Sequence, residues 1–301
     1  MIFRLWRLGV ALTGILPVRV SYAVAAFAAE VVWWCLPVQR GNATDTMLHV
    51  VGRRSPRRAR RLARRSFNNY ARYAVDFMRQ PRMDISRVQA LVDFDEWSRI
   101  SAAFTGGSGV IFVLTHFGNW DIGAAVLAAR GYQVNAVVET QGNGDFNRAL
   151  VEARAAPGVK LIPMERAAAG IIRALKRNQA LAILIDRPLG EGGVEVEFFD
   201  ARTRVPAGPA RIALRTGASV VPVSFVRLSG HSGRVRAIVD FDVSVNRTGD
   251  NERDVQALTQ RVMQAHECVI RQYPDQWYMF RRFWPSSALP NPSLLPAVVN
   301  G

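Results

Sequence analysis

Strand-like and helix-like patterns alternate from residue 109 onward, and this alternation constrains the fold more than any other feature. Short apolar runs typical of strands occupy 110–114, 132–138, 159–163, 181–185, 194–199 and 219–226. Helix-like runs lie between them at 119–130, 145–155, 167–178 and 207–216. Repeated βαβ units of this kind build a mostly parallel central sheet flanked by helices. We therefore expect an α/β fold, with a late strand over 235–245 at an edge and a long helix over 252–272.

Glycines follow three of the expected helices, at Gly131, Gly158 and Gly217, where a residue without a side chain can end a helix. A chain of 301 residues, nearly half of them apolar, can bury one large core and carry an appended segment. We expect three parts. Residues 1–50 form an N-terminal helical segment that associates with a membrane, 51–285 form the α/β domain, and 286–301 form a loosely ordered tail.

The N-terminal apolar stretch, from Leu8 to Pro37, has Arg19 and Glu30 within it. A cleaved signal peptide, a spanning helix and helices lying in the membrane interface are the three alternatives. A spanning helix would hold Arg19 or Glu30 in or near the hydrocarbon of the membrane, which costs a few kcal/mol for each centrally placed charge. Trp33 and Trp34 suit the interface. We favour interfacial attachment, or a single poorly insulated anchor, over secretion.

An arginine-rich segment follows, and residues 52–65 read GRRSPRRARRLARR. Eight arginines lie between Arg53 and Arg65, in a chain whose net charge is +15. The spacing predicts an amphipathic helix with Pro56 in its first turn and Ser55 as its cap. Such a charge favours a polyanionic partner, either an anionic membrane surface or nucleic acid. We expect no nucleic acid, because neither a zinc-finger spacing nor a known recognition motif is found.

The stretch from Val110 to Asp121, which reads VIFVLTHFGNWD, carries the clearest chemical signal. His116 is expected at the carboxyl end of a buried strand, where ligands bind in open α/β sheets, with Asp121 in the first turn of the next helix. An imidazole oriented by a carboxylate can take a proton from a hydroxyl group. The alternative is a structural histidine at a strand end and an acid that suits a helix N-terminus.

Other chemistries find less support in the sequence. The four histidines and two cysteines lie far apart, so we expect no metal site, and we expect no cofactor. A hydrolase on the same scaffold, with water in place of the acceptor hydroxyl, is a further alternative. However, the G-x-S-x-G pattern of a serine nucleophile is lacking.

Three segments together resemble a known family. They are THFGNWD at 115–121, the block at 181–223 that begins LAILIDRPLGEGGVEVEFF, and IRQYPDQWYMFRRFW at 270–284. This combination resembles the lipid A late acyltransferases and their relatives, the phosphatidylinositol mannoside acyltransferases, over roughly residues 60–285. The core motif, His-x4-Asp, is shared more widely with glycerolipid acyltransferases.

The resemblance implies transfer of a fatty acyl chain from acyl-CoA or acyl carrier protein to a hydroxyl group of a lipid or glycolipid. It also implies a location at the cytoplasmic face of a bacterial inner membrane. His116 matches the general base, Asp121 its acidic partner, and Glu195 a glutamate that partners the histidine in the mannoside branch. The residues expected to contact substrate are Arg154, Asp186, Arg187 and Asn119.

The oxyanion of the reaction needs hydrogen-bond donors. Backbone N–H groups at the start of the helix after Gly118 are available, and Arg154 or Arg187 can contribute. Each side chain also has a structural alternative. Arg154 can cap its helix, Asp186 can cap a turn, and Glu195 can be ordinary polarity on the solvent face of a strand.

Overall fold

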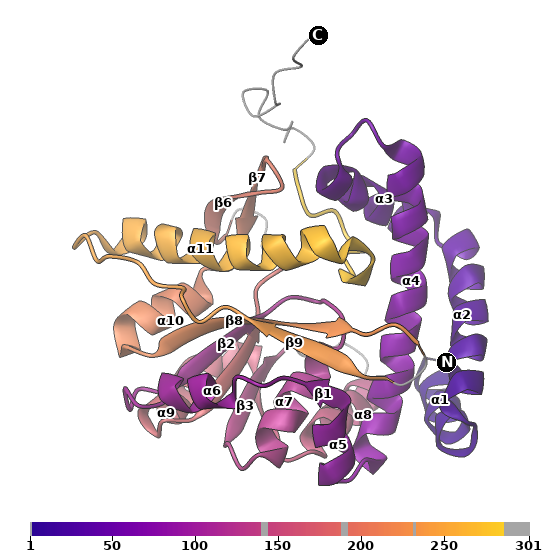
Figure 1. Ribbon diagram of the computed structural model, residues 1–301, viewed down its shortest axis with the longest axis horizontal. Helices are drawn as coiled ribbons and strands as arrows, with labels where there is room; N and C mark the ends of the chain where they lie inside the picture. Colours follow the sequence, from indigo (N-terminus) through magenta and orange to yellow (C-terminus); the bar gives the residue numbers. More distant parts are fainter. Residues whose placement is uncertain (1, 140–143, 188–191, 231–232, 286–301) are drawn as a thin grey trace.

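The computed structural model describes residues 2–285 apart from 140–143, 188–191 and 231–232, and its centre is a seven-stranded sheet (Figure 1). In spatial order the strands are β1 (Val92–Asp93), β9 (Val235–Val239), β8 (Ser219–Arg227), β2 (Val110–Leu114), β5 (Ala180–Leu184), β3 (Val134–Val138) and β4 (Lys160–Pro163). All neighbours are parallel except β8 and β9. The expected mostly parallel sheet is confirmed. The expected tail at 286–301 lies outside the described residues.

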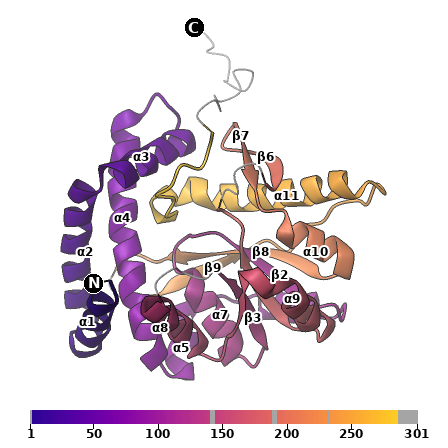
Figure 2. The same ribbon diagram turned by 180° about the vertical axis from the view of Figure 1, so that it is seen from behind.

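Helices cover both faces of the sheet, because alternate side chains of each strand point to opposite sides. Ile111 and Val113 of β2 join a core with α9 (Ala167–Lys176), α10 (Gly208–Thr216) and α11 (Asn251–Gln272). Phe112 and Leu114 join a second core on the opposite face. The helices of that face are α5 (Ile85–Leu91), α6 (Trp97–Ala103), α7 (Trp120–Ala129) and α8 (Gly144–Ala155). Figure 2 shows the two layers from behind.

One expected strand lies outside the central sheet. β6 (Val194–Phe198) pairs antiparallel with β7 (Ala201–Val205) in a hairpin that packs on α11. Phe199 and Asp200, at the turn, both have positive φ, as a tight two-residue hairpin turn requires. The apolar run at 194–199 is therefore not one of the parallel strands, as expected, and its partner β7, whose residues alternate between buried and exposed, is not predicted by the sequence patterns.

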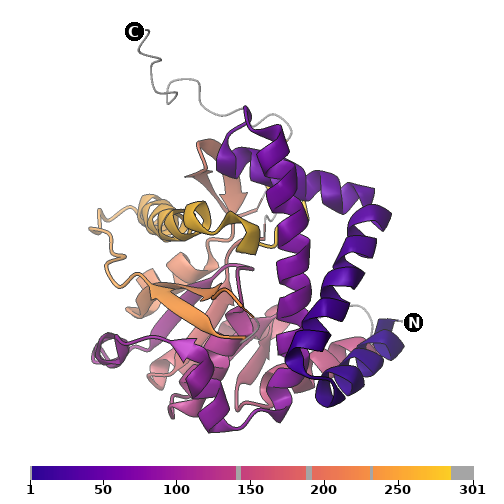
Figure 3. The ribbon, with the colours of Figure 1, turned by 45° about the vertical axis from the view of Figure 1, so that its right-hand side comes forward.

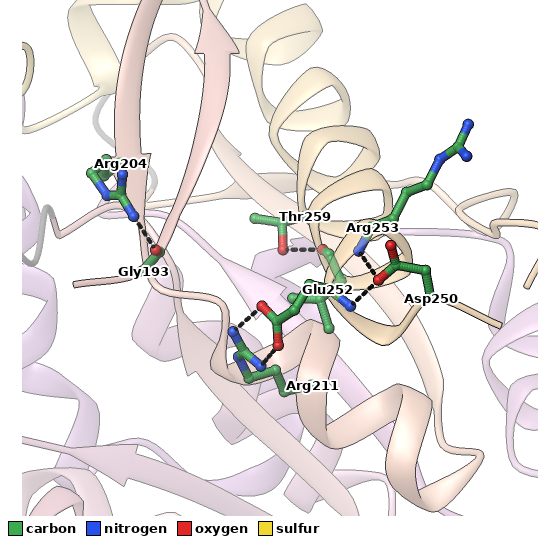
Figure 4. Close-up of polar contacts among 8 residues, drawn as sticks. Gly193, Arg204, Arg211, Asp250, Glu252, Arg253 and Thr259 are labelled. Atoms are coloured by element: carbon green, nitrogen blue, oxygen red, sulfur yellow. Dashed lines mark hydrogen bonds and ion pairs between the residues drawn. The ribbon is translucent and has the colours of Figure 1, made fainter. Parts of the chain in front are cut away.

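Polar contacts fix the beginning of α11 (Figure 4). The Asp250 carboxylate accepts hydrogen bonds from the backbone N–H groups of Glu252 and Arg253, at 3.0 and 3.2 Å. The Glu252 carboxylate in turn pairs with both terminal nitrogens of Arg211 on α10, at 2.5 and 2.7 Å. The cap therefore fixes the first turn of α11, and the two-point ion pair links this turn to α10.

Four helices form a layer at the side of the α/β domain (Figure 3). They are α1 (Ile2–Ile15), α2 (Val18–Cys35), α3 (Pro37–Val51) and α4 (Pro56–Arg79), and α2 and α3 pack on α4 around Trp33, Met47 and Phe67. The predicted helix start at Pro56 is confirmed, but Ser55 makes no side-chain capping hydrogen bond. Among the described helices, α2 alone has the length and apolar character to cross a membrane. Short 3-10 helices occupy Gln80–Arg82, Met164–Arg166 and Pro274–Gln276.

Candidate active site

The loop that carries His116 connects β2 to α7 at the carboxyl edge of the sheet. Its backbone is fixed by neighbouring segments, because the His116 carbonyl accepts from the N–H of Tyr278 at 2.9 Å and the Gly118 N–H donates to the carbonyl of Gln276 at 2.9 Å. Gly118 has φ +59, and a Cβ at this position would lie 1.8 Å from the carbonyl oxygen of Phe225. The loop therefore requires glycine here.

His116 forms a close pair with Asp186, which follows β5. The imidazole Nδ1 lies 2.7 Å from Oδ1 of Asp186, while Oδ2 accepts from the His116 backbone N–H at 2.8 Å and from the indole N–H of Trp277 at 2.9 Å. Burial alone raises the pKa of the Asp186 carboxyl, but His116 and these hydrogen bonds outweigh it, so that the pKa lies below its usual value. Asp186 is therefore an ionised acceptor.

An ionised acceptor fixes the protonation of the histidine ring. Nδ1 must donate its proton to the carboxylate, so in the neutral imidazole Nε2 carries the free lone pair. The His116 side chain is 16 % exposed, whereas Asp186 is fully buried. The ring of Trp120 packs edge-on to the imidazole, with the centroids 5.2 Å apart. The imidazole is thus held by Asp186 at Nδ1 while part of the ring remains exposed. This arrangement suits a base.

Asp121 has other partners. It lies in the first turn of α7, where it accepts from the hydroxyl of Tyr73 on α4 at 2.5 Å and from Nε of Arg154 on α8 at 3.0 Å. The acid that orients the His116 ring is Asp186 and not, as expected from the motif, Asp121. The reason is that the first turn of α7 directs this carboxylate toward α4 and α8.

The contact with Asp121 brings Arg154 into the site. The charge of Asp121 raises the pKa of the Arg154 guanidinium, which also lies 5.4 Å from the centre of the Phe77 ring. Arg154 is therefore held in place by an acid and an aromatic ring, and it does more than cap the end of α8.

Arg187 directly follows Asp186, and its guanidinium pairs with Glu139 at the end of β3. Burial, and then the nearby charge of Arg281, lower the pKa of Arg187. Asn119 is buried as the N-cap of α7, and its side chain accepts from the N–H of Ile122 at 3.4 Å. It is therefore already engaged within the protein.

Glu195 is not brought to the histidine by any contact within the described part of the chain. It lies on β6, its side chain is 47 % exposed, and it pairs with Arg202 on β7 at 3.3 Å. This agrees with the solvent-facing alternative, since the β6–β7 hairpin belongs to a separate sheet.

Two of the expected backbone donors after Gly118 are engaged within the protein. The Asn119 N–H donates to the carbonyl of Phe225, and the Ile122 N–H donates to the Asn119 side chain. The N–H groups of Trp120 and Asp121, and the side chains of Arg154 and Arg187, remain the candidates for this role.

A small apolar cavity lies between α7 and the sheet, with a volume of about 40 Å³. Its lining includes Leu114 and Trp120, on either side of the loop that carries His116, and Phe94 and Trp97 near the start of α6. Every side chain in its lining is apolar, so the cavity suits a hydrocarbon group.

Two residues that hold the acids of the site, Trp277 and Tyr73, were not predicted from the sequence. Trp277 lies within the closing motif, but nothing local shows that its indole reaches Asp186. Tyr73 was interpreted only as part of the packing face of its helix. A phenol on the packing face of the helix was the available signal, because a buried hydroxyl needs a partner.

The chain matches known proteins along most of its length. The bacterial lipid A biosynthesis acyltransferase family matches residues 2–286. A phosphatidylinositol mannoside acyltransferase of Mycolicibacterium smegmatis is 31% identical over 227 residues, which cover 74% of this chain and 72% of the relative. Proteins of the same name from two strains of Mycobacterium tuberculosis are 28% and 27% identical over 225 residues, 73% of this chain and 69% of each relative.

Proposed function

The chain belongs to the bacterial lipid A biosynthesis acyltransferase family, and we propose that it transfers a fatty acyl chain from acyl-CoA or acyl carrier protein to a hydroxyl group of a glycolipid resembling phosphatidylinositol mannoside. The observation that carries the proposal is the His116–Asp186 hydrogen bond at the carboxyl edge of the sheet, beside an apolar cavity. The names of the similar mycobacterial proteins favour a mannosylated acceptor over a lipid A precursor.

The chemistry follows from the lone pair on Nε2. An alcohol has a pKa far above 7, so a base must take its proton as its oxygen attacks the thioester carbonyl. His116 takes that proton, and the buried carboxylate of Asp186 stabilises the imidazolium that forms. As the carbon–sulfur bond breaks, the imidazolium returns the proton to the leaving thiolate. The products are an ester and a free thiol, and the enzyme is unchanged.

The apolar lining of the cavity beneath Trp120 supports entry of the donor's acyl chain at this point. The cavity has a volume of only about 40 Å³, so α7 must move away from the sheet to admit a long chain. Burying hydrocarbon supplies about 0.8 kcal/mol per methylene group, which favours that opening. The thioester carbonyl is then expected beside the imidazole that packs edge-on to Trp120.

Two apolar stripes support attachment to a membrane. Leu5, Leu8, Leu12 and Ile15 follow one face of α1, and all are exposed. A second exposed stripe runs along one face of α2 and consists of Val20, Val24, Phe27, Val31 and Trp34. Glu30, which a spanning helix would carry into hydrocarbon, pairs instead with Arg64 of α4 at 2.7 Å. We therefore propose that α1 and α2 lie in the interface and remain packed on the protein.

The arginine-rich segment 53–65, which leads into α4, supports binding to anionic head groups. Of its eight arginines, Arg64 and Arg65 pair with Glu30 and Asp275. The other six are exposed and pair with no carboxylate among the residues that the structure describes. Each is expected to add about 1 kcal/mol of attraction to an anionic surface.

The test of the function is acyl transfer by a His116→Ala variant. Purified protein is incubated with palmitoyl-CoA or palmitoyl carrier protein and phosphatidylinositol mannoside in detergent micelles, and the acylated product is quantified by mass spectrometry. The wild type should form product and the variant should lose nearly all transfer while it keeps the melting temperature of the wild type. Undiminished transfer by the variant would refute the mechanism, and thioester hydrolysis that exceeds transfer in the wild type would indicate a hydrolase.

A further inference from the structure

The carboxylate of Asp186 has a second side-chain partner besides His116. Its Oδ2 atom accepts from the indole N–H of Trp277 at 2.9 Å and from the His116 backbone N–H at 2.8 Å, while Oδ1 lies 2.7 Å from the imidazole. Asp186 and Trp277 are both fully buried. Solvent therefore cannot take the place of the indole N–H on this carboxylate.

The indole of Trp277 is held in place by its surroundings. Its ring packs against that of Phe283, with the centroids 5.2 Å apart, and its backbone pairs with Phe117 of the β2–α7 loop in an isolated β-bridge. The preceding residue is fixed as well, because the side-chain amide of Gln276 pairs with both backbone groups of Arg227, at 2.7 and 3.0 Å. The ring therefore has little freedom to turn its N–H away from the carboxylate.

A neutral donor on this carboxylate changes how strongly it acts on the imidazole. Hydrogen bonds to an ionised carboxylate stabilise its charged form and spread part of its negative charge onto the donors. Asp186 consequently attracts the imidazolium less strongly than a carboxylate with fewer donors would, although it still fixes Nδ1 as the protonated nitrogen. An indole suits this role because it donates one hydrogen bond and carries no charge, whereas an arginine or a lysine would neutralise the carboxylate.

The other ionisable groups around the pair, within the described part of the chain, are neutral or already paired. On α11, burial lowers the pKa of His266 to about 4, so this ring is uncharged near neutral pH. Burial raises the pKa of the Tyr278 phenol above its ordinary value, so this group is uncharged as well. Arg187, which follows Asp186, pairs with Glu139. The groups on α7, α8 and α4, which pair with one another, are Asp121, Arg154 and Tyr73.

We propose that Trp277 is a positioning residue that sets the base strength of His116 through Asp186. The inference rests on the proposed function, in which one imidazole takes a proton from an alcohol and returns it to a thiolate. A more basic imidazole would be protonated before the alcohol reaches it, and a weaker base would take the proton less readily. The indole N–H keeps the imidazole between these limits, because it moderates the carboxylate behind the ring.

The experiment measures protonation of His116 directly and compares it with activity. Protein labelled with isotope-enriched histidine is titrated by NMR in neutral detergent micelles, and the His116 signal is identified by its absence from His116→Ala. The pH profile of kcat/KM for palmitoyl-CoA reports protonation of the same base during catalysis.

Two matched variants separate the hydrogen bond from the packing. Trp277→Phe removes the indole N–H and keeps an aromatic ring. Trp284→Phe makes the same change in the same aromatic cluster, since the two rings lie 6.1 Å apart. The Trp284 indole N–H donates instead to the backbone carbonyl of Phe198, at 3.1 Å. Trp284→Phe therefore loses a comparable buried hydrogen bond without a change at Asp186.

Trp277→Phe should move the midpoint of the His116 titration, and the acidic limb of the kcat/KM profile, upward by about half a pH unit. The reason is that a carboxylate with one donor fewer attracts the imidazolium more strongly, so the ring keeps its proton to higher pH. Below the midpoint, kcat/KM should consequently fall about threefold relative to its value at high pH. Trp284→Phe should leave both midpoints within about 0.1 pH unit of the wild type.

The proposal is overturned if the midpoints of Trp277→Phe stay with those of the wild type or move downward, or if Trp284→Phe moves them equally. If Trp277→Phe does not fold, position 277 receives benzothienylalanine, in which sulfur replaces the indole N–H within a ring of nearly the same shape. The same upward shift is then expected, and an unchanged midpoint again overturns the proposal.

This outcome is separable from failure of the proposed function, because the NMR titration of His116 needs no substrate. Should His116→Ala transfer palmitate as well as the wild type does, the general-base mechanism fails whatever the midpoints show. Should His116→Ala be inactive while Trp277→Phe keeps the midpoint of the wild type, the role of Trp277 alone fails.

Discussion

Asp186 and Asp121 are two carboxylates of one site with different neighbours. Asp186 receives two N–H donors on Oδ2 and the imidazole Nδ1 on Oδ1. Asp121 receives a phenol and a guanidinium. A carboxylate can act only on the groups that it contacts, so Asp186 orients the His116 ring and Asp121 anchors Arg154.

The buried imidazole of His266 on α11 leads to a prediction about how stability depends on pH. Burial lowers the pKa of its imidazole to about 4, against about 6.5 in an unfolded chain. Between these pH values the unfolded chain binds a proton that the folded protein does not, so the free energy of unfolding falls as the pH falls from 6.5 toward 4. This residue should account for a loss of about 3 kcal/mol across that window.

Urea denaturation at several pH values measures this dependence of the free energy of unfolding on pH. A His266→Leu variant should show a shallower decrease in the free energy of unfolding than the wild type between pH 6.5 and 4. Equal slopes for the two proteins would show that the buried imidazole is not responsible.

At the scale of elements, the β2–α7 loop depends on one residue. Gly118→Ala would place a Cβ 1.8 Å from the carbonyl oxygen of Phe225 at φ +59, so the loop and His116 must move. We expect a loss of at least about 2 kcal/mol in stability and nearly complete loss of transfer. Gly131→Ala is the matched control, since it also has positive φ but open space around it, and should cost only about 1 kcal/mol with transfer retained.

The cavity between α7 and the sheet predicts chain-length selectivity. Ala124→Leu adds bulk to the lining without a charge, so less hydrocarbon fits. Transfer from palmitoyl-CoA should fall about tenfold or more, while transfer from octanoyl-CoA is largely retained. Ala129→Leu on the same helix does not reach the cavity lining and should affect both donors equally. Equal losses for both donors in Ala124→Leu would place the acyl chain elsewhere.

For the whole molecule, the outer faces of α1 and α2 predict how it meets a membrane. Ile15→Glu with Phe27→Glu puts two charges into the exposed apolar stripes, and binding to vesicles that contain anionic lipid should fall at least about tenfold in a flotation assay. Ile85→Glu, which changes an exposed apolar residue of α5, should bind as the wild type does. If the double variant floats with the vesicles as before, these stripes are not the attachment surface.

Local sequence patterns predicted the parts of the molecule that local interactions decide. The central strands, the helix after His116 and the edge of the sheet at which His116 lies follow from apolar periodicity and glycine positions. The partner of His116 did not follow, because Asp186 is 70 residues away and reaches it only through the pairing of β2 with β5. The position of Glu195 could not be predicted for the same reason, since strand order and not spacing assigns β6 to a separate hairpin.

The most direct measurement is the kcat of acyl transfer for Asp186→Asn beside that for Asp121→Asn, with both variants shown to be folded by circular dichroism. Asparagine at 186 can no longer fix Nδ1 as the protonated nitrogen, so kcat should fall by about 10³- to 10⁴-fold. Asparagine at 121 leaves the imidazole oriented and should lower kcat only about tenfold. An Asp186→Asn enzyme that turns over as fast as the wild type, or faster than Asp121→Asn, would contradict the assignment of Asp186 as the partner of the catalytic base.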